Sequence, residues 1–165
     1  IAFTDRVGPG VILPARPQWL SRPAGQVAFP GGRVDPEDVS IEAAALREAE
    51  EEIALPRAAA RIAGRSISFH SGSGFDITPV VAVIPPDLPL RPDPNEVDQI
   101  FEVPLGLLLD RANFAAQTAE WMGQIREYHE LHWGGFHIWG ITAAILLNLS
   151  LQLDGQFALG QGAAT

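Results

Sequence analysis

One acidic helix, placed between turn-rich and β-branched stretches, constrains the fold of this chain more than any other feature. Ser40 is a suitable N-cap, and apolar residues recur at helical spacing from Ile41 to Ile53, before Pro56 ends the pattern. The spacing predicts a helix over about residues 40–53. Inside it lies "REAEEE", a run of one arginine and four glutamates at residues 47–52.

Stretches with the features of β-strands lie on both sides of the helix, separated by glycine- and proline-rich turns. We expect strands over residues 11–17, 26–29, 61–70, 75–84 and 97–104, and residues 1–4 as the remnant of another. We also expect helical turns over 104–110, a hairpin over 124–133 and 136–139, and a buried helix within 138–153. This order predicts an α/β fold with a mixed β-sheet packed between helices.

Composition limits the classes of function. A chain of 165 residues fits one domain, and a start at Ile1 is compatible with further residues upstream. The net charge is −9 and all eleven cations are arginines, which argues against a nucleic-acid partner. The longest apolar stretch has sixteen residues, with Asn148, Ser150 and Gln152 among them, and is short for a membrane span. We expect a cytoplasmic protein without a membrane partner, and the oligomeric state stays open.

The acidic run places three carboxylates on one face of the predicted helix. At 100° per residue, Glu48, Glu51 and Glu52 fall within about 100° of one another, and Glu50 points to the far side. Arg47 lies one turn before Glu51, where it can pair with that carboxylate and orient it. Like charges at these spacings repel. A divalent cation such as Mg²⁺, which prefers oxygen ligands and substrate phosphates, would offset the repulsion.

A solvated acidic face is the usual explanation of such a run, but two neighbouring features favour a metal site. Gly31 and Gly32 precede the helix and permit a backbone turn that approaches a phosphate or offers a carbonyl to a metal. Residues 1–33 carry a net charge of +3, and residues 34–55 carry −7. If both segments line one cleft, arginines would hold substrate phosphates beside glutamates that hold metal.

The same residues resemble the box of the Nudix hydrolases, which reads G, five residues, E, seven residues, then R-E-U-x-E-E-x-G-U, with U aliphatic. "REAEEEIAL" supplies the second half of the box, with Ala54 at the position of the box glycine. From Gly32, five residues lead to Asp38 in place of the first glutamate, and eight residues then lead to Arg47. The resemblance implies an α/β/α sandwich and hydrolysis that depends on Mg²⁺ or Mn²⁺.

The longer, aspartate-containing loop is similar to one branch of the family, the coenzyme A pyrophosphatases, which combine "GGxxDPxD" with "ALREAEEE". The chain also matches an upstream motif of that branch at Arg16, Gly25 and residues 29–32. It departs from that motif at Pro14, Pro17 and Ser21. The implied reaction is hydrolysis of the diphosphate of coenzyme A or acyl-coenzyme A, giving 3′,5′-ADP and (acyl-)4′-phosphopantetheine.

The resemblance also implies roles for individual residues. Glu48, Glu51 and Glu52 would ligate the metal and Arg47 would orient them, with Glu48 alternatively acting as the base. Substrate contacts would come from the upstream residues Arg16, Arg22, Gly31 and Gly32. Asp38 occupies the position of the first box acid, and the shifted spacing leaves its role open.

Other polar residues fit structural roles better. Glu96 and Glu102 follow a proline-rich loop and are candidates for a base, although solvated charges are the commoner case. His129 and His132 would lie on opposite faces of one strand, so we expect these two and His137 to be surface histidines rather than metal ligands.

Two other functions fit the sequence. The first is a Nudix hydrolase of another nucleoside diphosphate derivative, such as ADP-ribose, since one fold hosts several substrates and the upstream motif is imperfect. The second is a catalytically weak domain that binds a nucleotide or a partner protein. The complete set of Arg47 and three glutamates argues against lost catalysis.

Overall fold

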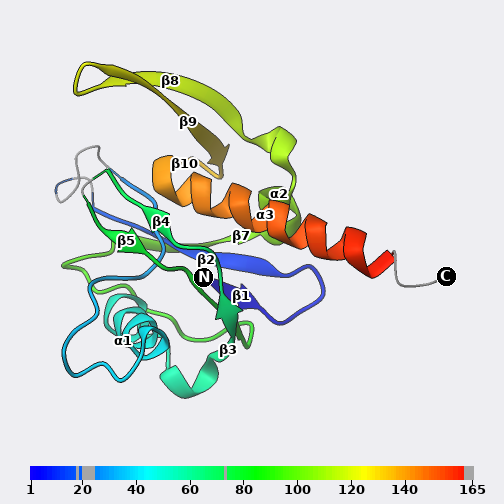
Figure 1. Cartoon of the computed structure of the whole chain (residues 1–165). Helices are drawn as coiled ribbons and strands as arrows, with labels where there is room; N and C mark the ends of the chain where they lie inside the picture. The colour runs from blue at the N-terminus through cyan, green and yellow to red at the C-terminus, as the bar shows by residue number, and fades with distance from the viewer. Residues whose placement is uncertain (18, 20–24, 73, 162–165) are drawn as a thin grey trace.

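The computed structural model describes residues 1–17, 19, 25–72 and 74–161, and gives side-chain burial up to residue 153. A five-stranded sheet in the order β3-β6-β1-β2-β7 forms its centre (Figure 1). β1 and β6 run parallel, and the other neighbours are antiparallel, so the sheet is mixed. These strands are β1 (Ala2–Thr4), β2 (Gly10–Ala15), β3 (Arg61–Arg65), β6 (Val80–Ile84) and β7 (Gln99–Pro104).

Two smaller sheets and three helices complete the described part of the chain. One sheet has the order β10-β9-β8 and the other pairs β4 with β5. Their strands are β4 (Phe69–His70), β5 (Asp76–Ile77), β8 (Ala115–Trp121), β9 (Gln124–Trp133) and β10 (Phe136–Trp139). The helices are α1 (Ile41–Ile53), α2 (Leu105–Leu109) and α3 (Gly140–Gln161), with 3-10 turns at Arg57–Ala59 and Arg111–Asn113.

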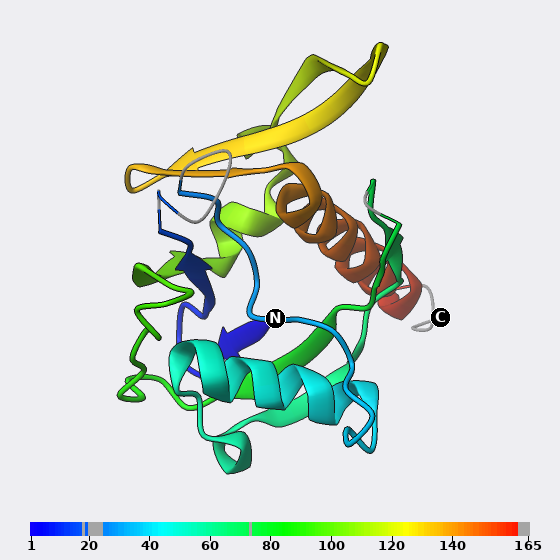
Figure 2. The same cartoon turned by 90° about the vertical axis from the view of Figure 1, so that its left-hand side faces the viewer.

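The central sheet packs against a helix on each face. Alternate residues of a strand point to opposite faces, and β2 follows this rule. Val11 and Leu13 join one buried cluster with Leu146 of α3, whereas Ile12 joins another with Ile53 of α1. Figure 2 shows α1 and α3 on opposite sides of the molecule, with the β8–β9 hairpin beyond α3. The predicted α/β fold with a mixed sheet between helices is therefore confirmed.

The bounds of α1 follow from its two ends. The Ser40 hydroxyl accepts a hydrogen bond from the Ala43 amide at 3.0 Å, which confirms the predicted N-cap. At the other end Ala54 has a left-handed conformation with φ of 54°. Its amide donates to the Glu50 carbonyl, and the Leu55 amide donates to the Ala49 carbonyl. This is a Schellman ending, in which the left-handed residue is usually glycine.

Several predicted strands differ from the observed ones. Residues 26–29 contribute only an isolated bridge between Val27 and Ala15. The stretch 61–70 divides into β3 and β4. The stretch 75–84 divides into β5 and β6 next to Pro79, which has no amide to donate to a ladder. α3 begins at Gly140 rather than at residue 138, since β10 extends to Trp139.

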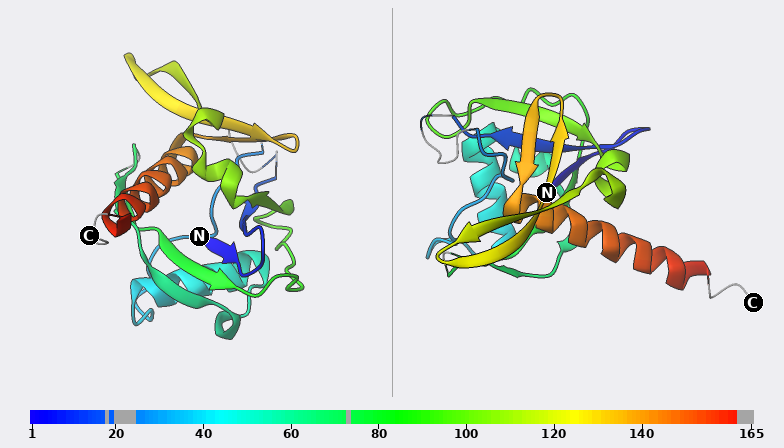
Figure 3. Two further views of the ribbon diagram at one scale, coloured as in Figure 1. Left: turned by 90° about the vertical axis from the view of Figure 1, so that its right-hand side faces the viewer. Right: turned by 90° about the horizontal axis from the view of Figure 1, so that it is seen from above.

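One strand was absent from the sequence-based prediction. β8 is exposed along its whole length, so it shows no alternation of buried and exposed residues that would reveal it. It pairs with β9 from Ala115 to Trp121 and extends the predicted hairpin into a three-stranded sheet (Figure 3). No helix in the described ranges is long and apolar enough to cross a membrane.

The left-handed residue after α1 generates a prediction about stability. We expect Ala54→Gly to raise the free energy of unfolding by about 1 kcal/mol, because a Cβ in this conformation is strained and glycine is not. Urea denaturation of the two proteins measures the difference. Ala58→Gly, in the 3-10 turn that follows, is the control and should not stabilise. Equal midpoints for wild type and Ala54→Gly would contradict the strain argument.

Candidate active site

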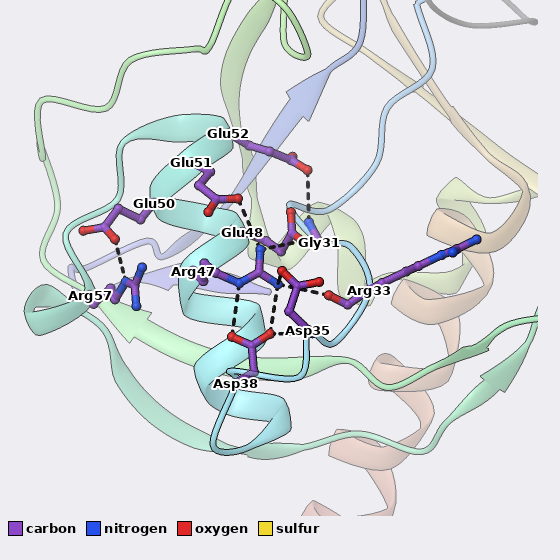
Figure 4. A network of polar contacts seen from close by, with 10 residues as sticks. All are labelled: Gly31, Arg33, Asp35, Asp38, Arg47, Glu48, Glu50, Glu51, Glu52 and Arg57. Carbon is purple, nitrogen blue, oxygen red and sulfur yellow. Dashed lines mark hydrogen bonds and ion pairs between the residues drawn. The ribbon is translucent and has the colours of Figure 1, made fainter.

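The guanidinium of Arg47 connects the acidic helix to the loop before it (Figure 4). Its Nη1 donates to Glu48 Oε1 at 3.0 Å and to Glu51 Oε2 at 3.2 Å. Its Nη2 donates to the backbone carbonyl of Arg33 at 3.0 Å. The side chain is only 16% exposed, so these are largely desolvated, charge-assisted contacts. The predicted pairing of Arg47 with Glu51 is present, and the same group also binds Glu48.

Asp38 is the partner that fixes the orientation of Arg47. Its two carboxylate oxygens accept from Arg47 Nε at 3.1 Å and from Nη2 at 2.9 Å, which is a bidentate pair. Asp38 Oδ2 also accepts from the Asp35 amide at 2.8 Å. The hydrogen bond from Arg47 is the main reason that the pKa of Asp38 lies below its usual range. The first-acid position of the box is thus occupied by a residue that holds the arginine.

Two glycines bring the loop close to the glutamates. A Cβ on Gly32 would lie 2.2 Å from Glu48 Oε1, so a larger residue here would displace the Glu48 carboxylate from its position beside Arg47. The Gly31 amide points at Glu52 Oε1 at a distance of 3.4 Å. Glu50, by contrast, turns away from the loop and pairs with Arg57 at 2.5 Å on an exposed surface. The helix thus presents Glu48, Glu51 and Glu52 on the loop side.

Glu52 is the buried member of the set, with 5% of its surface exposed. Burial disfavours the charged carboxylate and raises the pKa of Glu52 to about 7, and the Gly31 hydrogen bond and the charge of Arg16 only partly oppose this shift. Nearby Glu96 and Glu48 add repulsion. A divalent cation here would favour the ionised form of Glu52.

The donors on this face fit a hard cation, because all of them are carboxylate oxygens. They do not yet converge. In the described part of the chain, Glu48, Glu51 and Glu52 do not bring three ligand atoms within 4.8 Å of one another. The guanidinium of Arg47 lies between the first two and binds both. Binding of one ion by all three therefore requires their side chains to close in.

A cavity of about 810 Å³ opens beside the glycine loop. Arg16, Gly31, Gly32 and Arg33 form part of its wall, and most of the remaining lining is apolar. Three of the four residues expected to contact substrate therefore lie on one cavity. The fourth, Arg22, lies outside the described residues. Arg33 also stacks over the ring of Phe75 at 4.8 Å, and Phe75 lines the same cavity.

The two candidate bases, Glu96 in the proline-rich loop and Glu102 on β7, have different surroundings. The Asp93 amide donates to the Glu52 carbonyl at 2.9 Å, which ties the proline-rich loop to the end of α1. Glu96 follows in that loop, is exposed, and acts on the charge of Glu52. Glu102 instead accepts from the Thr4 hydroxyl at 2.7 Å and pairs with Arg6 at 2.5 Å. Only Glu96 therefore shares the surroundings of the acidic helix.

Comparison with known proteins decides the family. The family model described as the NUDIX domain matches residues 1–124. The chain belongs to the Nudix hydrolases. It is 41% identical over 153 residues to the uncharacterized Nudix hydrolase NudL of Escherichia coli O1:K1 / APEC. The match covers 93% of this chain and 80% of that protein, and NudL of Shigella boydii serotype 18 matches equally well.

Solved structures support the Nudix fold. RenU, a Nudix hydrolase from M. smegmatis, is similar with a TM-score of 0.57 and 21% identity, over 96% of this chain and 81% of that one. A binary complex of a C. elegans Ap4A hydrolase is similar with a TM-score of 0.54 and 17% identity, over 64% and 77% of the two chains. As a Nudix hydrolase, the protein acts on pyrophosphate bonds of nucleoside diphosphate derivatives and, like the family in general, requires a divalent metal.

The raised pKa of Glu52 predicts how metal-free stability depends on pH. Below pH 4.5 the Glu52 carboxyl is protonated in both the folded and the unfolded state, so it does not lower the free energy of unfolding. As pH rises through about 7 the folded protein loses stability, because the unfolded state ionises this group more easily. In thermal melts with EDTA, the melting temperature of Glu52→Gln relative to that of wild type should rise from pH 4.5 to 7 and stay constant above pH 7. A constant difference across this range would contradict the assignment.

Proposed function

We propose that the protein hydrolyses the diphosphate of coenzyme A or acyl-coenzyme A, giving 3′,5′-ADP and 4′-phosphopantetheine or its acyl derivative. The metal would be Mg²⁺ or Mn²⁺, since the donors are carboxylates. The proposal includes a cytoplasmic location.

The cavity beside the glycine loop is the observation that supports this substrate class. Its wall combines Arg16 and Arg33 with a largely apolar lining from α1, the central sheet and α3. A diphosphate suits the arginines, and a long, flexible arm with methyl and methylene groups suits the apolar part. ADP-ribose is the alternative, but its second ribose carries hydroxyls that an apolar wall leaves unpaired.

In this proposal the glutamates and the arginine of the acidic helix have different roles. Glu48, Glu51 and Glu52 would hold the cation, which when bound would stabilise charge on the diphosphate and lower the pKa of water. Arg47 would keep two of these carboxylates in place through the contacts it already makes. Arg16 would bind a phosphate oxygen, and the Gly31–Gly32 backbone would let the diphosphate approach α1.

The proton of the attacking water needs an acceptor. Glu96 is the better of the two candidates outside the box, because its charge acts on Glu52 whereas Glu102, on β7, is paired with Thr4 and Arg6. Glu48 is the alternative within the box, and its hydrogen bond from Arg47 keeps it beside the guanidinium. A carboxylate in either position would accept the proton as the phosphorus–oxygen bond forms.

Product analysis tests the substrate. The protein is incubated with Mg²⁺ or Mn²⁺ and, separately, with coenzyme A, an acyl-coenzyme A and ADP-ribose, and products are identified by mass. We expect 3′,5′-ADP from the first two, with kcat/KM at least tenfold above that for ADP-ribose. Preferential cleavage of ADP-ribose would overturn the substrate assignment and leave the Nudix chemistry intact.

A matched pair of variants tests the site. Glu52→Gln removes a proposed metal ligand at small structural cost, and we expect kcat to fall by about 10²-fold or more. Glu50→Gln changes a neighbouring glutamate on the opposite side of α1 and should retain wild-type turnover. Circular dichroism confirms that both variants fold. Full activity in Glu52→Gln would show that the metal site lies elsewhere.

A further inference from the structure

The outer face of the three-stranded sheet holds a group of polar residues that the hydrolase site does not use. Glu130 and His132 are two residues apart on β9 and share one face. His132 is the cross-strand partner of His137 on β10. The opposite face of these strands carries Leu131 and Ile138, which are buried in the cluster that includes residues of α3. Figure 1 shows this sheet on the far side of the molecule from α1.

The three side chains are in contact with one another. The imidazoles of His132 and His137 stack with centroids 4.4 Å apart and planes 4° from parallel. His137 Nε2 lies 2.7 Å from Glu130 Oε2. One ligand atom from each residue lies within 4.8 Å of the other two, and no other triad of possible ligands in the described ranges meets this condition.

The surroundings fix two of these side chains. Gln117 on β8 donates to Glu130 Oε1 at 2.9 Å, which orients the carboxylate from the side opposite His137. The Trp139 ring stacks on His137 with centroids 6.0 Å apart, so this imidazole is held between Trp139 and His132. The pKa of Glu130 is lowered, first by its hydrogen bond with His137, and the carboxylate is therefore charged at neutral pH.

We propose that Glu130, His132 and His137 bind one transition-metal ion of the Zn²⁺ class, separate from the cation of the acidic helix. Two imidazole nitrogens and one carboxylate oxygen suit Zn²⁺, Cu²⁺ or Ni²⁺ better than Mg²⁺, which prefers oxygen alone. Three protein ligands leave a fourth position for water.

The required movement is small. Ligands at about 2.1 Å from one ion in a tetrahedral site lie about 3.4 Å apart, so atoms within 4.8 Å of one another have to approach by at most about 1.4 Å. His132 is exposed and can make this adjustment by rotation about its side-chain bonds. The ion would replace the hydrogen bond between His137 and Glu130.

The position of the site indicates a structural role. β10 leads directly into α3, and Thr142 near the start of α3 donates to the Val27 carbonyl at 2.9 Å. An ion bound by β9 and β10 would fix the hairpin that precedes this helix. Binding to the folded state alone would raise the melting temperature.

Zinc titration of tag-free, EDTA-treated full-length protein tests the proposal, with 5 mM Mg²⁺ present to occupy the acidic helix. We expect one Zn²⁺ per chain with micromolar or tighter affinity and a higher melting temperature. His132→Ala and His137→Ala should each weaken binding at least tenfold. His129→Ala is the matched control, because His129 lies on β9 with its side chain on the opposite face, and it should bind as wild type does.

Cobalt spectroscopy distinguishes this site from the carboxylate site. Tetrahedral Co²⁺ bound to two imidazoles absorbs visible light. We expect this absorption to persist in Glu52→Gln and to disappear in the double variant that carries both Glu130→Gln and His132→Gln. Equal Zn²⁺ affinity in wild type, His132→Ala and His137→Ala would overturn the proposal. So would the absence of Zn²⁺ binding by folded wild type, or loss of the cobalt signal in Glu52→Gln alone.

Discussion

The bidentate pair between Asp38 and Arg47 is the interaction on which the arrangement of the acidic helix depends. Three carboxylates on one helical face repel, and a largely buried arginine has to be fixed before it can offset that repulsion. Asp38 binds one edge of the guanidinium, and Glu48 and Glu51 bind the remaining Nη1. The cation and its acidic partners thus form one network in which helix and loop position each other.

Glu52 lies outside this network, in surroundings that disfavour its charged form. It is buried, receives only a long hydrogen bond from Gly31, and has a raised pKa. Two carboxylates are therefore paired with an arginine, and a third is buried in an environment that favours its neutral form. A divalent ion that binds all three would draw Glu52 into the charged set. The second group of donors, Glu130, His132 and His137, combines nitrogen and oxygen, so donor chemistry separates the two proposed ions.

Local patterns predicted the elements that carry their own signal. The 3.6-residue spacing and Ser40 located α1, and the motif assigned Gly32 and Glu48 to one site, where the structure places the loop in contact with the Glu48 carboxylate. β8 gave no signal, because neither of its faces is buried. The role of Asp38 depends on a loop conformation that folds back on α1, which residue spacing does not encode. The alternation of His129 and His132 along one strand places them on opposite faces and gives no sign of a shared site. The tight turn at Gly134 and Gly135 pairs His132 with His137 and is the feature of the sequence that indicates the triad.

The affinity for Mn²⁺ of Asp38→Asn tests most directly whether the Asp38–Arg47 pair holds the metal-binding carboxylates. Asparagine keeps the shape of the side chain and removes its charge, and Asp38 itself is assigned no contact with metal or substrate. With zinc and cobalt absent, we expect Mn²⁺ binding, followed by electron paramagnetic resonance, to weaken about tenfold in Asp38→Asn. Glu37→Gln, a neighbouring exposed acid, should bind as wild type does. Wild-type affinity in a folded Asp38→Asn variant would show that the Asp38–Arg47 pair does not hold the metal-binding carboxylates.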